Sequence, residues 1–465
     1  MGGLAILGLQ MFEKKVSTRP SSPENFGERC CLPWSSMLLL VGLLALSVRI
    51  YYVTHVVVFQ PANMPNAHGD AAQYYNYARN LIEHHVFSAD PPSAFLPVGD
   101  SFRDPGYPAF LAIWMTIFPQ WDSWYAAILL SQAVLGSLTV MLWVSVGRHV
   151  MPTPWLIAAG VIMAIWPHSV TSSSDIMSET LYGFLVAFAL FIFCVAQQRE
   201  SVAWALASGL CFTMAALTNA VLLPFAALVV LYAVLRRRIN GRVAFVLVAT
   251  VLALTIPWAI RNNMQRTDQP SSSDRAIMNF VQGSWPIYHD ANKASLIMQD
   301  AGATRALNQI NSEISVMEHD HRAGLSMIGQ RMALAPGSYA LWYLGKPALL
   351  WDWNLRIAAG DIYFHVTYHS PFEVNPLWRS IAALCHTCNR LLMLLCLLGC
   401  VLALDRNALS LEAANTALLL VFITLVHSVL QAEPRYSTPY RGAEILLGVF
   451  AVSLLTKKFA SIRKR

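Results

Sequence analysis

Charged residues are scarce in this chain of 465 residues. Asp, Glu, Lys and Arg together make up 12% of it and hydrophobic residues make up 56%, whereas an average globular domain carries roughly 25% charged residues. This deficit excludes a series of soluble domains. The sequence also lacks a soluble basic face or an aromatic-interleaved module, so we expect no nucleic-acid partner.

A disulfide framework is also missing, although the chain has eight cysteines. Four of them lie in apolar segments, where a thiol usually packs as a small hydrophobe: Cys194, Cys211, Cys396 and Cys400. Cys385 and Cys388 have CxxC spacing, but they supply only two of the four ligands that structural zinc sites use. The cysteine pattern therefore does not favour a metal or redox role.

Long apolar runs are what the sequence has in abundance. A helix that crosses a bilayer needs about 20 predominantly apolar residues, and hydropathy predicts ten such segments. They lie near 35–58, 126–147, 153–170, 178–196, 203–219, 221–235, 243–260, 383–404, 411–431 and 440–456. The sequence therefore predicts an all-α integral membrane protein with about ten transmembrane helices.

Basic residues set the expected orientation, because cytoplasmic flanks of spans carry an excess of Lys and Arg. Such residues precede the first span, fall at alternate junctions and close the chain: Lys14, Lys15, Arg19, Arg148, Arg199, the cluster at 236–242 and the tail at 457–465. We expect a multi-pass protein of the inner (cytoplasmic) membrane with both termini cytoplasmic. Arg49, inside the first span, does not fit this pattern.

Five parts of the chain follow from these segments. They are a cytoplasmic tail (1–34), a transmembrane catalytic module with a first outer loop at 59–104 (35–260), an extracytoplasmic region (261–380), the C-terminal transmembrane helices (381–456) and a basic cytoplasmic tail (457–465). Three outer stretches, 69–85, 108–118 and 336–350, are too short or too polar to cross the bilayer. We expect them to form interfacial helices that cap the bundle on the outside.

The first outer loop carries two candidate catalytic residues, Asp70 and Arg103. A carboxylate beside an arginine at a membrane surface can act as a general base opposite a bound phosphate. The alternative role for Asp70 is helix capping, since Gln73 follows it at the third position. Asp104 before Pro105 is most simply a turn former.

A second acidic site, Asp175 and Glu179, lies at the outer mouth of the fourth predicted span. Four positions separate the two carboxylates, so both face the same side of one helical turn. Their repulsion raises one pKa unless a cation or a metal lies between them. The alternative is an N-terminal cap with acidic first-turn residues, which the helix dipole favours.

Two arginines at predicted outer ends of spans, Arg261 and Arg435, complete the candidate site. A guanidinium can clamp a phosphate with two parallel hydrogen bonds, although snorkelling to lipid headgroups is its commoner role there. Two pairs of histidines have ligand-like spacing but lie in polar loops, where histidines are usually solvated: His319 with His321, and His365 with His369.

Taken in order, several stretches resemble one known family. They are Gly69-Asp70-Ala71-Ala72-Gln73-Tyr74, Phe102-Arg103-Asp104-Pro105-Gly106-Tyr107-Pro108, Ser178-Glu179, Pro257-Trp258 with Arg261-Asn262, and Arg435-Tyr436-Ser437-Thr438-Pro439. Their succession is similar to that of the GT-C membrane glycosyltransferases, in particular the bacterial relatives of protein O-mannosyltransferases and of the lipid A aminoarabinose transferase. The resemblance implies an inverting transfer of a hexose or pentose from a polyprenyl-phosphate donor to a protein, lipid or glycan acceptor on the extracytoplasmic face.

The resemblance also implies roles for single residues. Asp70 matches the acidic residue that deprotonates the acceptor hydroxyl, and Arg103 meets the donor phosphate, as we also expect for Arg261 and Arg435. Asp175 or Glu179 matches a second acidic position that orients the acceptor or holds a divalent metal, with Asp175 as the candidate metal ligand. Tyr74 and Tyr107 are the expected substrate contacts. We expect no cofactor other than this metal, whose requirement stays open.

The sequence departs from the family pattern at two places. Asp70 is followed by Ala71 where many relatives have a second carboxylate, and Asn219 follows Thr218 where several carry lysine. The alternative function is a transporter or flippase of lipid-linked sugars, which would place charged residues deep within its spans. Here the distinctive charges cluster at outer mouths, which favours an enzyme.

Overall fold

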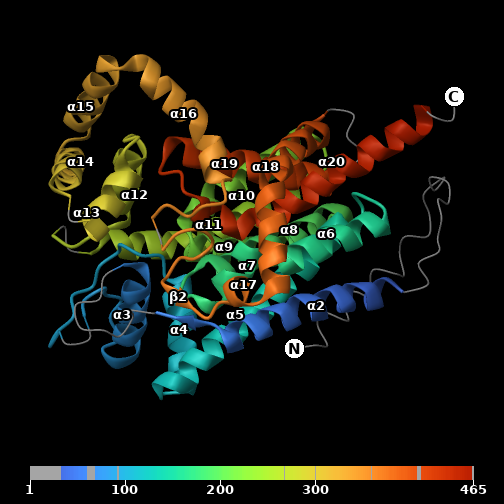
Figure 1. Cartoon of the computed structure of the whole chain (residues 1–465), viewed down its shortest axis with the longest axis horizontal. Helices are drawn as coiled ribbons and strands as arrows, with labels where there is room; N and C mark the ends of the chain where they lie inside the picture. Colours follow the sequence, from blue (N-terminus) through green and yellow to red (C-terminus); the bar gives the residue numbers. More distant parts are fainter. Residues whose placement is uncertain are drawn as a thin grey trace.

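The computed structural model is almost entirely helical (Figure 1). It describes residues 33–59, 69–91, 94–265, 268–298, 300–357, 359–405 and 410–462. The predicted N-terminal tail and the last three residues of the basic tail therefore lie outside the described residues, apart from positions 33 and 34. His68, next to the first acidic motif, is also outside them.

Every predicted apolar segment falls on a helix. The helices are α2 (Trp34–His55), α5 (Trp121–Gly147), α6 (Thr153–Ile165), α8 (Glu179–Arg199), α9 (Val202–Thr218), α10 (Leu223–Leu235), α11 (Gly241–Asn263), α18 (Pro376–Leu404), α19 (Leu411–Val429) and α20 (Arg441–Ile462). Among the described residues, six are long and apolar enough to cross a membrane: α2, α5, α8, α11, α18 and α19. A seventh span arises if α6 and the segment Pro167–Ser174 count as one, bent by 56°.

The count of about ten spans is therefore not confirmed. The helices α9 and α10 have 17 and 13 residues, fewer than the roughly 20 that cross a bilayer without distortion. The bend after α6 has a local cause, since the residue before a proline is pushed out of the helical region. Trp166, which precedes Pro167, has an extended ψ of 117°.

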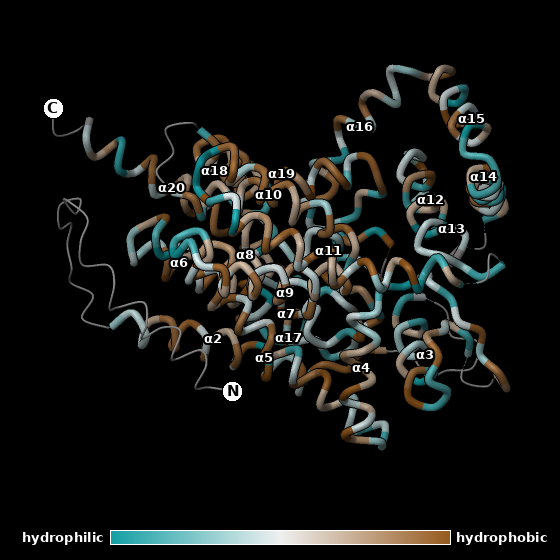
Figure 2. The backbone as a smooth tube through the Cα atoms, turned by 180° about the vertical axis from the view of Figure 1, so that it is seen from behind, coloured by the Kyte–Doolittle hydropathy of each residue, from teal (hydrophilic) through white to brown (hydrophobic). Residues whose placement is uncertain are grey.

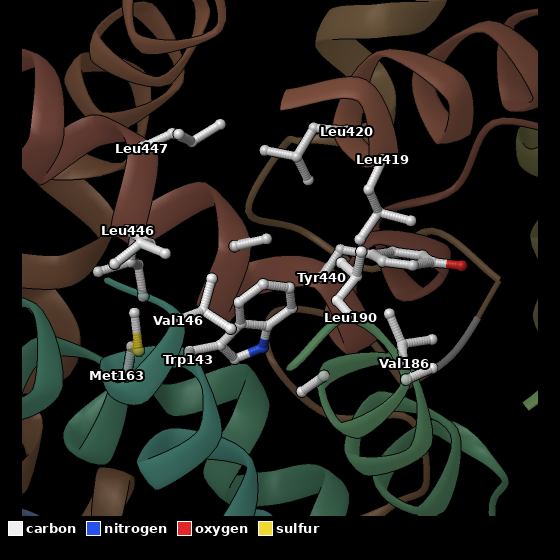
Figure 3. Packing of buried hydrophobic residues seen from close by; sticks show 14 of the residues in the cluster. Trp143, Val146, Met163, Val186, Leu190, Leu419, Leu420, Tyr440, Leu446 and Leu447 are labelled. Atoms are coloured by element: carbon white, nitrogen blue, oxygen red, sulfur yellow. The ribbon is translucent and has the colours of Figure 1, made fainter. Parts of the chain in front are cut away.

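The core of the bundle is a continuous apolar cluster contributed by spans far apart in sequence. Figure 3 shows Trp143 of α5, Leu190 of α8, Leu419 of α19 and Leu446 of α20 pointing toward one another. Close helix approach also depends on a small residue: a Cβ on Gly399 of α18 would lie 2.3 Å from the Leu447 carbonyl oxygen of α20. Small residues at such crossings allow membrane helices to pack through their backbones.

The outer elements gather at one end of the bundle. They are α3 (Asp70–Glu83), α4 (Gly106–Ile117), α12 (Ser272–Gly283), α13 (Tyr288–Met298), α14 (Ala301–His319), α15 (His321–Leu334) and α16 (Pro336–Leu350). In Figure 1, α3 and α12–α15 lie at the left, opposite the start of α2 and the end of α20 at the right. Figure 2 shows hydrophilic colours concentrated on α14 and α15, away from the hydrophobic spans.

Helices form where the interfacial stretches were predicted, as α3, α4 and α16. No motif was found in 261–380, yet the structure arranges this region as an arch of helices with a small core of its own around Val281, Ile310 and Ile328. Lys346 of α16 is fully buried, and its Nζ donates to the Gly283 carbonyl at 2.9 Å. The same Nζ donates to the Leu430 carbonyl at the end of α19, so this lysine ties the arch to the bundle instead of reaching water.

A loop at 351–370 returns from the arch to the outer mouth of the bundle. Its end forms the strand β2 (Thr367–Tyr368), which pairs antiparallel with β1 (Val57–Val58) after α2. Two residues of the bent segment Pro167–Ser174 hold the middle of the loop. His168 Nε2 lies 2.7 Å from the Trp353 carbonyl, and Thr171 Oγ1 donates to the Ile362 carbonyl at 3.1 Å. The short helices η2 (Ser172–Ser174), α7 (Pro167–Thr171), α17 (Pro371–Val374), η3 (Ala220–Leu222) and η4 (Pro434–Tyr440) complete the connections.

Candidate active site

Arg435 stands at the centre of a cluster of acidic residues at the outer mouth. It belongs to η4, which leads directly into α20, and its side chain is 10% exposed. Nη1 contacts Asp70 Oδ2 at 2.7 Å and Nε donates to Glu179 Oε1. The guanidinium also lies 4.2 Å from the centre of the Phe364 ring. Three elements far apart in sequence therefore meet on one cation.

Asp70 is the first residue of α3, and its N-cap is Gly69, whose φ of 97° suits glycine. The capping role considered for Asp70 is not what the structure shows, because its oxygens contact Arg103 and Arg435 instead. Burial would by itself raise the pKa of this carboxyl group, but the two guanidinium groups hold it well below its usual range.

Arg103 also contacts Asp70, as expected from the sequence, which predicts that the two residues lie at one site. Its Nη2 donates to Asp70 Oδ1 and its Nε donates to Gln73 Oε1 at 2.7 Å. The guanidinium also lies 5.2 Å from the centre of the Tyr74 ring. Gln73 thus orients the arginine, since the guanidinium presents its donors in a fixed fork.

Asp175 is the second carboxylate of interest, and it occupies a different environment. It lies between η2 and α8, with its side chain 8% exposed and its Oδ1 3.7 Å from His365 Nδ1. Burial, reinforced by the charge of Glu179, raises the pKa of Asp175 to about 8, although Arg435 opposes this effect. Burial, together with Arg435, lowers the pKa of His365 to about 4. The imidazole is therefore neutral at pH 7.

A small cavity separates these groups. It has a volume of about 30 Å³ and is lined by Asp175, Glu179, Phe364, Arg435 and Thr438 among others. Such a space holds about two water molecules and is too small for a sugar. Leu355, Ile362 and Phe364 of the loop at 351–370 form part of its wall.

The two predicted substrate-contact tyrosines lie in the wall beneath the cluster. Tyr74 OH donates to Ser178 Oγ at 3.3 Å, next to Glu179. Tyr107 is fully buried, and its hydroxyl donates to Gln132 Oε1 at 3.0 Å. Gln132 in turn donates to the Asp175 carbonyl at 3.0 Å. These hydrogen bonds connect the two tyrosines to the turn that carries Asp175 and Glu179.

Arg261 is not brought into the cluster. Its guanidinium donates to the main-chain carbonyls of Asp100 and Phe87, the latter at 3.2 Å. It therefore fastens the first outer loop to the end of α11. Asp104 has a structural partner as well, since Arg275 Nη2 lies 2.8 Å from its Oδ2.

The residues present do not fit a divalent metal at Asp175. In the part of the chain that the structure describes, no three His, Cys, Asp or Glu side chains are grouped to hold a metal ion. The place of a cation between Asp70 and Glu179 is taken by Arg435. His319 and His321 lie against carbonyls one helical turn earlier, at 2.8 and 2.6 Å.

Sequence reasoning missed two residues of this site. Phe364 had no signal of its own, and His365 was noticed only as part of a ligand-like pair with His369. Neither lies on a helix with a readable period, because both belong to the loop at 351–370. The pairing of β1 with β2 and the contacts with His168 and Thr171 help to hold this loop over the acidic residues.

Comparisons with known proteins support the fold. No protein-family profile matches the chain, and no curated protein matches it. Among solved structures, the Archaeoglobus fulgidus oligosaccharyltransferase tethered with an acceptor peptide matches with a TM-score of 0.53 and 15% identity, over 92% of this chain and 50% of that one. The same organism's AglB in complex with an inhibitory peptide and a dolichol-phosphate gives 0.52 and 14%, over 92% and 51%.

ArnT from Cupriavidus metallidurans, bound to undecaprenyl phosphate, is a more distant structural match, with a TM-score of 0.37 and 15% identity over 90% of this chain and 78% of ArnT. The chain spans about half the length of the archaeal oligosaccharyltransferases that it matches. At these identities the likeness is one of fold. The predicted resemblance is thus confirmed at the level of the fold, by the two archaeal oligosaccharyltransferase structures.

Proposed function

We propose that this chain is an inverting glycosyltransferase that moves a hexose or pentose from a polyprenyl-phosphate donor to a protein, lipid or glycan acceptor. The observation that carries the proposal is the buried cluster in which Arg435 holds Asp70 and Glu179 beside Asp175. It lies in a fold shared with oligosaccharyltransferases. The AglB structure contains a dolichol-phosphate, a lipid phosphate of the class proposed here as the donor's carrier.

The two arginines next to Asp70 are the proposed phosphate-binding groups. Arg103 and Arg435 meet on this carboxylate, so Asp70 holds two cations together where their like charges would otherwise repel. Guanidinium groups then stabilise the negative charge that grows on the departing phosphate. Arg261 contributes by holding the first outer loop in place.

The geometry favours Asp175 over Asp70 as the general base. Both oxygens of Asp70 are engaged by arginines, which leaves a weak proton acceptor. Asp175 has no guanidinium partner among its described contacts, faces His365 and has a raised pKa. Two carboxyl groups whose environments push their pKa values apart commonly divide their roles in this way.

The reaction that these groups support is a single displacement. Asp175 takes the proton of the acceptor hydroxyl while the hydroxyl oxygen forms a bond to the anomeric carbon. The bond from that carbon to the phosphate oxygen breaks on the opposite face, and its electron pair stays with the polyprenyl phosphate. Because the hydroxyl attacks from the face opposite the leaving phosphate, the anomeric carbon is inverted, with His365 lying 3.7 Å from the base.

We place this site at the extracytoplasmic face of the inner membrane, as the charge pattern predicts. The catalytic unit is then not confined to 35–260, because Phe364, His365 and Arg435 come from later parts of the chain. The transporter alternative gains little, since the cluster lies at the outer ends of the spans. We expect the arch of α12–α16 to contribute to the acceptor side.

The proposal predicts that membranes containing the protein consume one polyprenyl-phosphate sugar from a panel of donors. Membranes from the same host without the protein serve as the control. Loss of a single donor, with release of polyprenyl phosphate, would establish a transferase and identify the sugar. Donors that stay intact while tagged lipid-linked sugar changes leaflet would instead support the transporter.

The pH dependence of transfer separates the two carboxylates. With Asp175 as base, only its ionised form works, so the rate rises as pH increases toward about 8 and levels off above it. With Asp70 as base, the rate would be flat across this range, because its pKa is held well below the usual value. The measurement is the initial rate from pH 6 to about pH 9 at saturating donor.

A further inference from the structure

A second cavity lies between the start of the loop at 351–370 and α18, and it shares no lining residue with the small cavity beside Asp175. It has a volume of about 350 Å³, within the range of small-molecule sites. Its lining combines the start of the loop with one face of α18: Asp352, Trp353, Asn354, His386, Thr387, Asn389 and Arg390. None of these residues takes part in the proposed transfer.

Hydrogen bonds show where this cavity lies along the length of the bundle. Asn389 Oδ1 accepts from Arg441 Nη1 at 3.3 Å, and Arg441 is the first residue of α20, directly after the helix η4 that carries Arg435. The Arg441 guanidinium also donates to the Asp352 carbonyl at 2.7 Å. The cavity is therefore level with the outer mouth of the bundle. About 21 Å of α18 continues beyond Arg390 toward Leu404.

Arg390 gives this cavity a cation without a partner. It is exposed, and no ion pair or side-chain hydrogen bond joins it to another described residue. An arginine on a spanning helix at the lipid boundary is costly unless it meets an anion. A guanidinium binds phosphate with two parallel hydrogen bonds, and phospholipid headgroups present phosphate at the membrane surface.

The other polar residues that line the cavity can form hydrogen bonds with hydroxyl groups of a ligand next to that phosphate. Asp352 Oδ1 already accepts from the Trp353 main-chain N–H at 2.8 Å, which fixes the carboxylate at the cavity wall. Asn354 and Thr387 add an amide and a hydroxyl. The rings of Trp353 and His386 stack with centroids 5.1 Å apart and form one apolar side.

An apolar stripe continues from Arg390 along the same face of α18. Leu394, Leu397 and Val401 follow it at helical spacing and are 66%, 63% and 62% exposed. A cation at the outer level with exposed aliphatic side chains below it matches one lipid molecule, with its headgroup in the cavity and its chain along the helix. A free phosphate ion would use only the first of these features.

We propose that this cavity binds the headgroup of a membrane lipid that carries a phosphate and hydroxyl groups. Arg390 holds the phosphate, Asp352 and Asn354 accept from the hydroxyl groups, and the stripe Leu394–Val401 accommodates the chain. This inference does not depend on the transfer reaction, since it concerns binding alone. The bound lipid would contact Trp353, which also contacts His168, a residue that lines the small cavity beside the acidic cluster.

The test is a titration of the detergent-purified full chain with phosphatidylglycerol, followed by native mass spectrometry. Arg390→Gln should weaken binding about tenfold through loss of a charge-assisted contact. Thr387→Trp, which fills the cavity and keeps the charge, should do the same. Arg379→Gln is the matched control, because Arg379 is an exposed arginine on the same helix outside the cavity lining.

Three competitors distinguish the source of the phosphate. Diacylglycerol, which lacks phosphate, should not compete, and inorganic phosphate should compete only weakly. If a polyprenyl-phosphate sugar displaces phosphatidylglycerol when present at a lower concentration, the occupant is a lipid-linked sugar. If it does not, the occupant is the surrounding phospholipid. Equal binding by all three variants, or equal competition by inorganic phosphate, would overturn the proposal.

Discussion

Asp175→Asn is expected to lower the rate of sugar transfer by a factor on the order of 10²–10⁴, the range that general base catalysis contributes. The amide is nearly isosteric with the carboxylate but cannot take the acceptor proton. Because burial disfavours the charged form of Asp175, the neutral amide should leave the protein as stable as before. The measurement is the initial rate of donor consumption by purified protein, with thermal unfolding followed in parallel.

Asp122→Asn is the matched control for this variant. Asp122 is an exposed carboxylate in the first turn of α5, also at the outer end of a span. It should retain the rate of the unmodified protein. If Asp175→Asn retained the full rate, the role of base would return to Asp70. A transfer rate that does not change with pH and that is lost only in an Asp70 variant would lead to the same conclusion.

Arg435→Met should both abolish transfer and destabilise the fold. The substitution leaves Asp70 and Glu179 in a largely buried site without the cation that they share. Breaking a buried ion pair by removing one partner costs about 3–5 kcal/mol. Transfer is lost because the phosphate no longer meets this guanidinium as charge develops on it. Chemical unfolding in detergent measures the first effect and donor consumption measures the second.

The control for Arg435 is an arginine in an exposed ion pair. Arg356 Nη2 lies 2.8 Å from Asp290 Oδ1, and the two side chains are 29% and 75% exposed. Such pairs contribute roughly 0–1 kcal/mol, so Arg356→Gln should unfold at nearly the same denaturant concentration as the unmodified protein. Equal losses of stability in the two variants would show that Arg435 is no more than a surface cation.

The helical bundle could be predicted from the sequence because each span carries its own signal in a long apolar run. The first acidic motif was also readable, since Asp70 and Arg103 lie in one loop and do meet. The count of spans was harder to predict, because hydropathy cannot tell the 13-residue helix α10 from a full crossing.

The partners of Arg435 could not be predicted in the same way. Its contacts with Asp70 and Glu179 depend on how η4 packs against α3 and α8, which no local pattern encodes. Arg261 is a different case, since an arginine at a span end predicts phosphate binding, whereas in the structure its guanidinium donates to two main-chain carbonyls. His365 reaches Asp175 through a loop that the pairing of two short strands and the contacts of His168 and Thr171 hold in place.

The position of Arg435 in the chain has a consequence for biosynthesis. It meets Glu179 from 256 residues further along, and chains emerge from the ribosome N-terminus first. Until η4 follows α19 into place, Glu179 lacks the cation that it contacts in the folded chain, whereas Asp70 already has Arg103 from the same outer loop. We therefore expect the pair of Asp70 and Arg103 to form first, and the full cluster to assemble only after Arg435 has been synthesised.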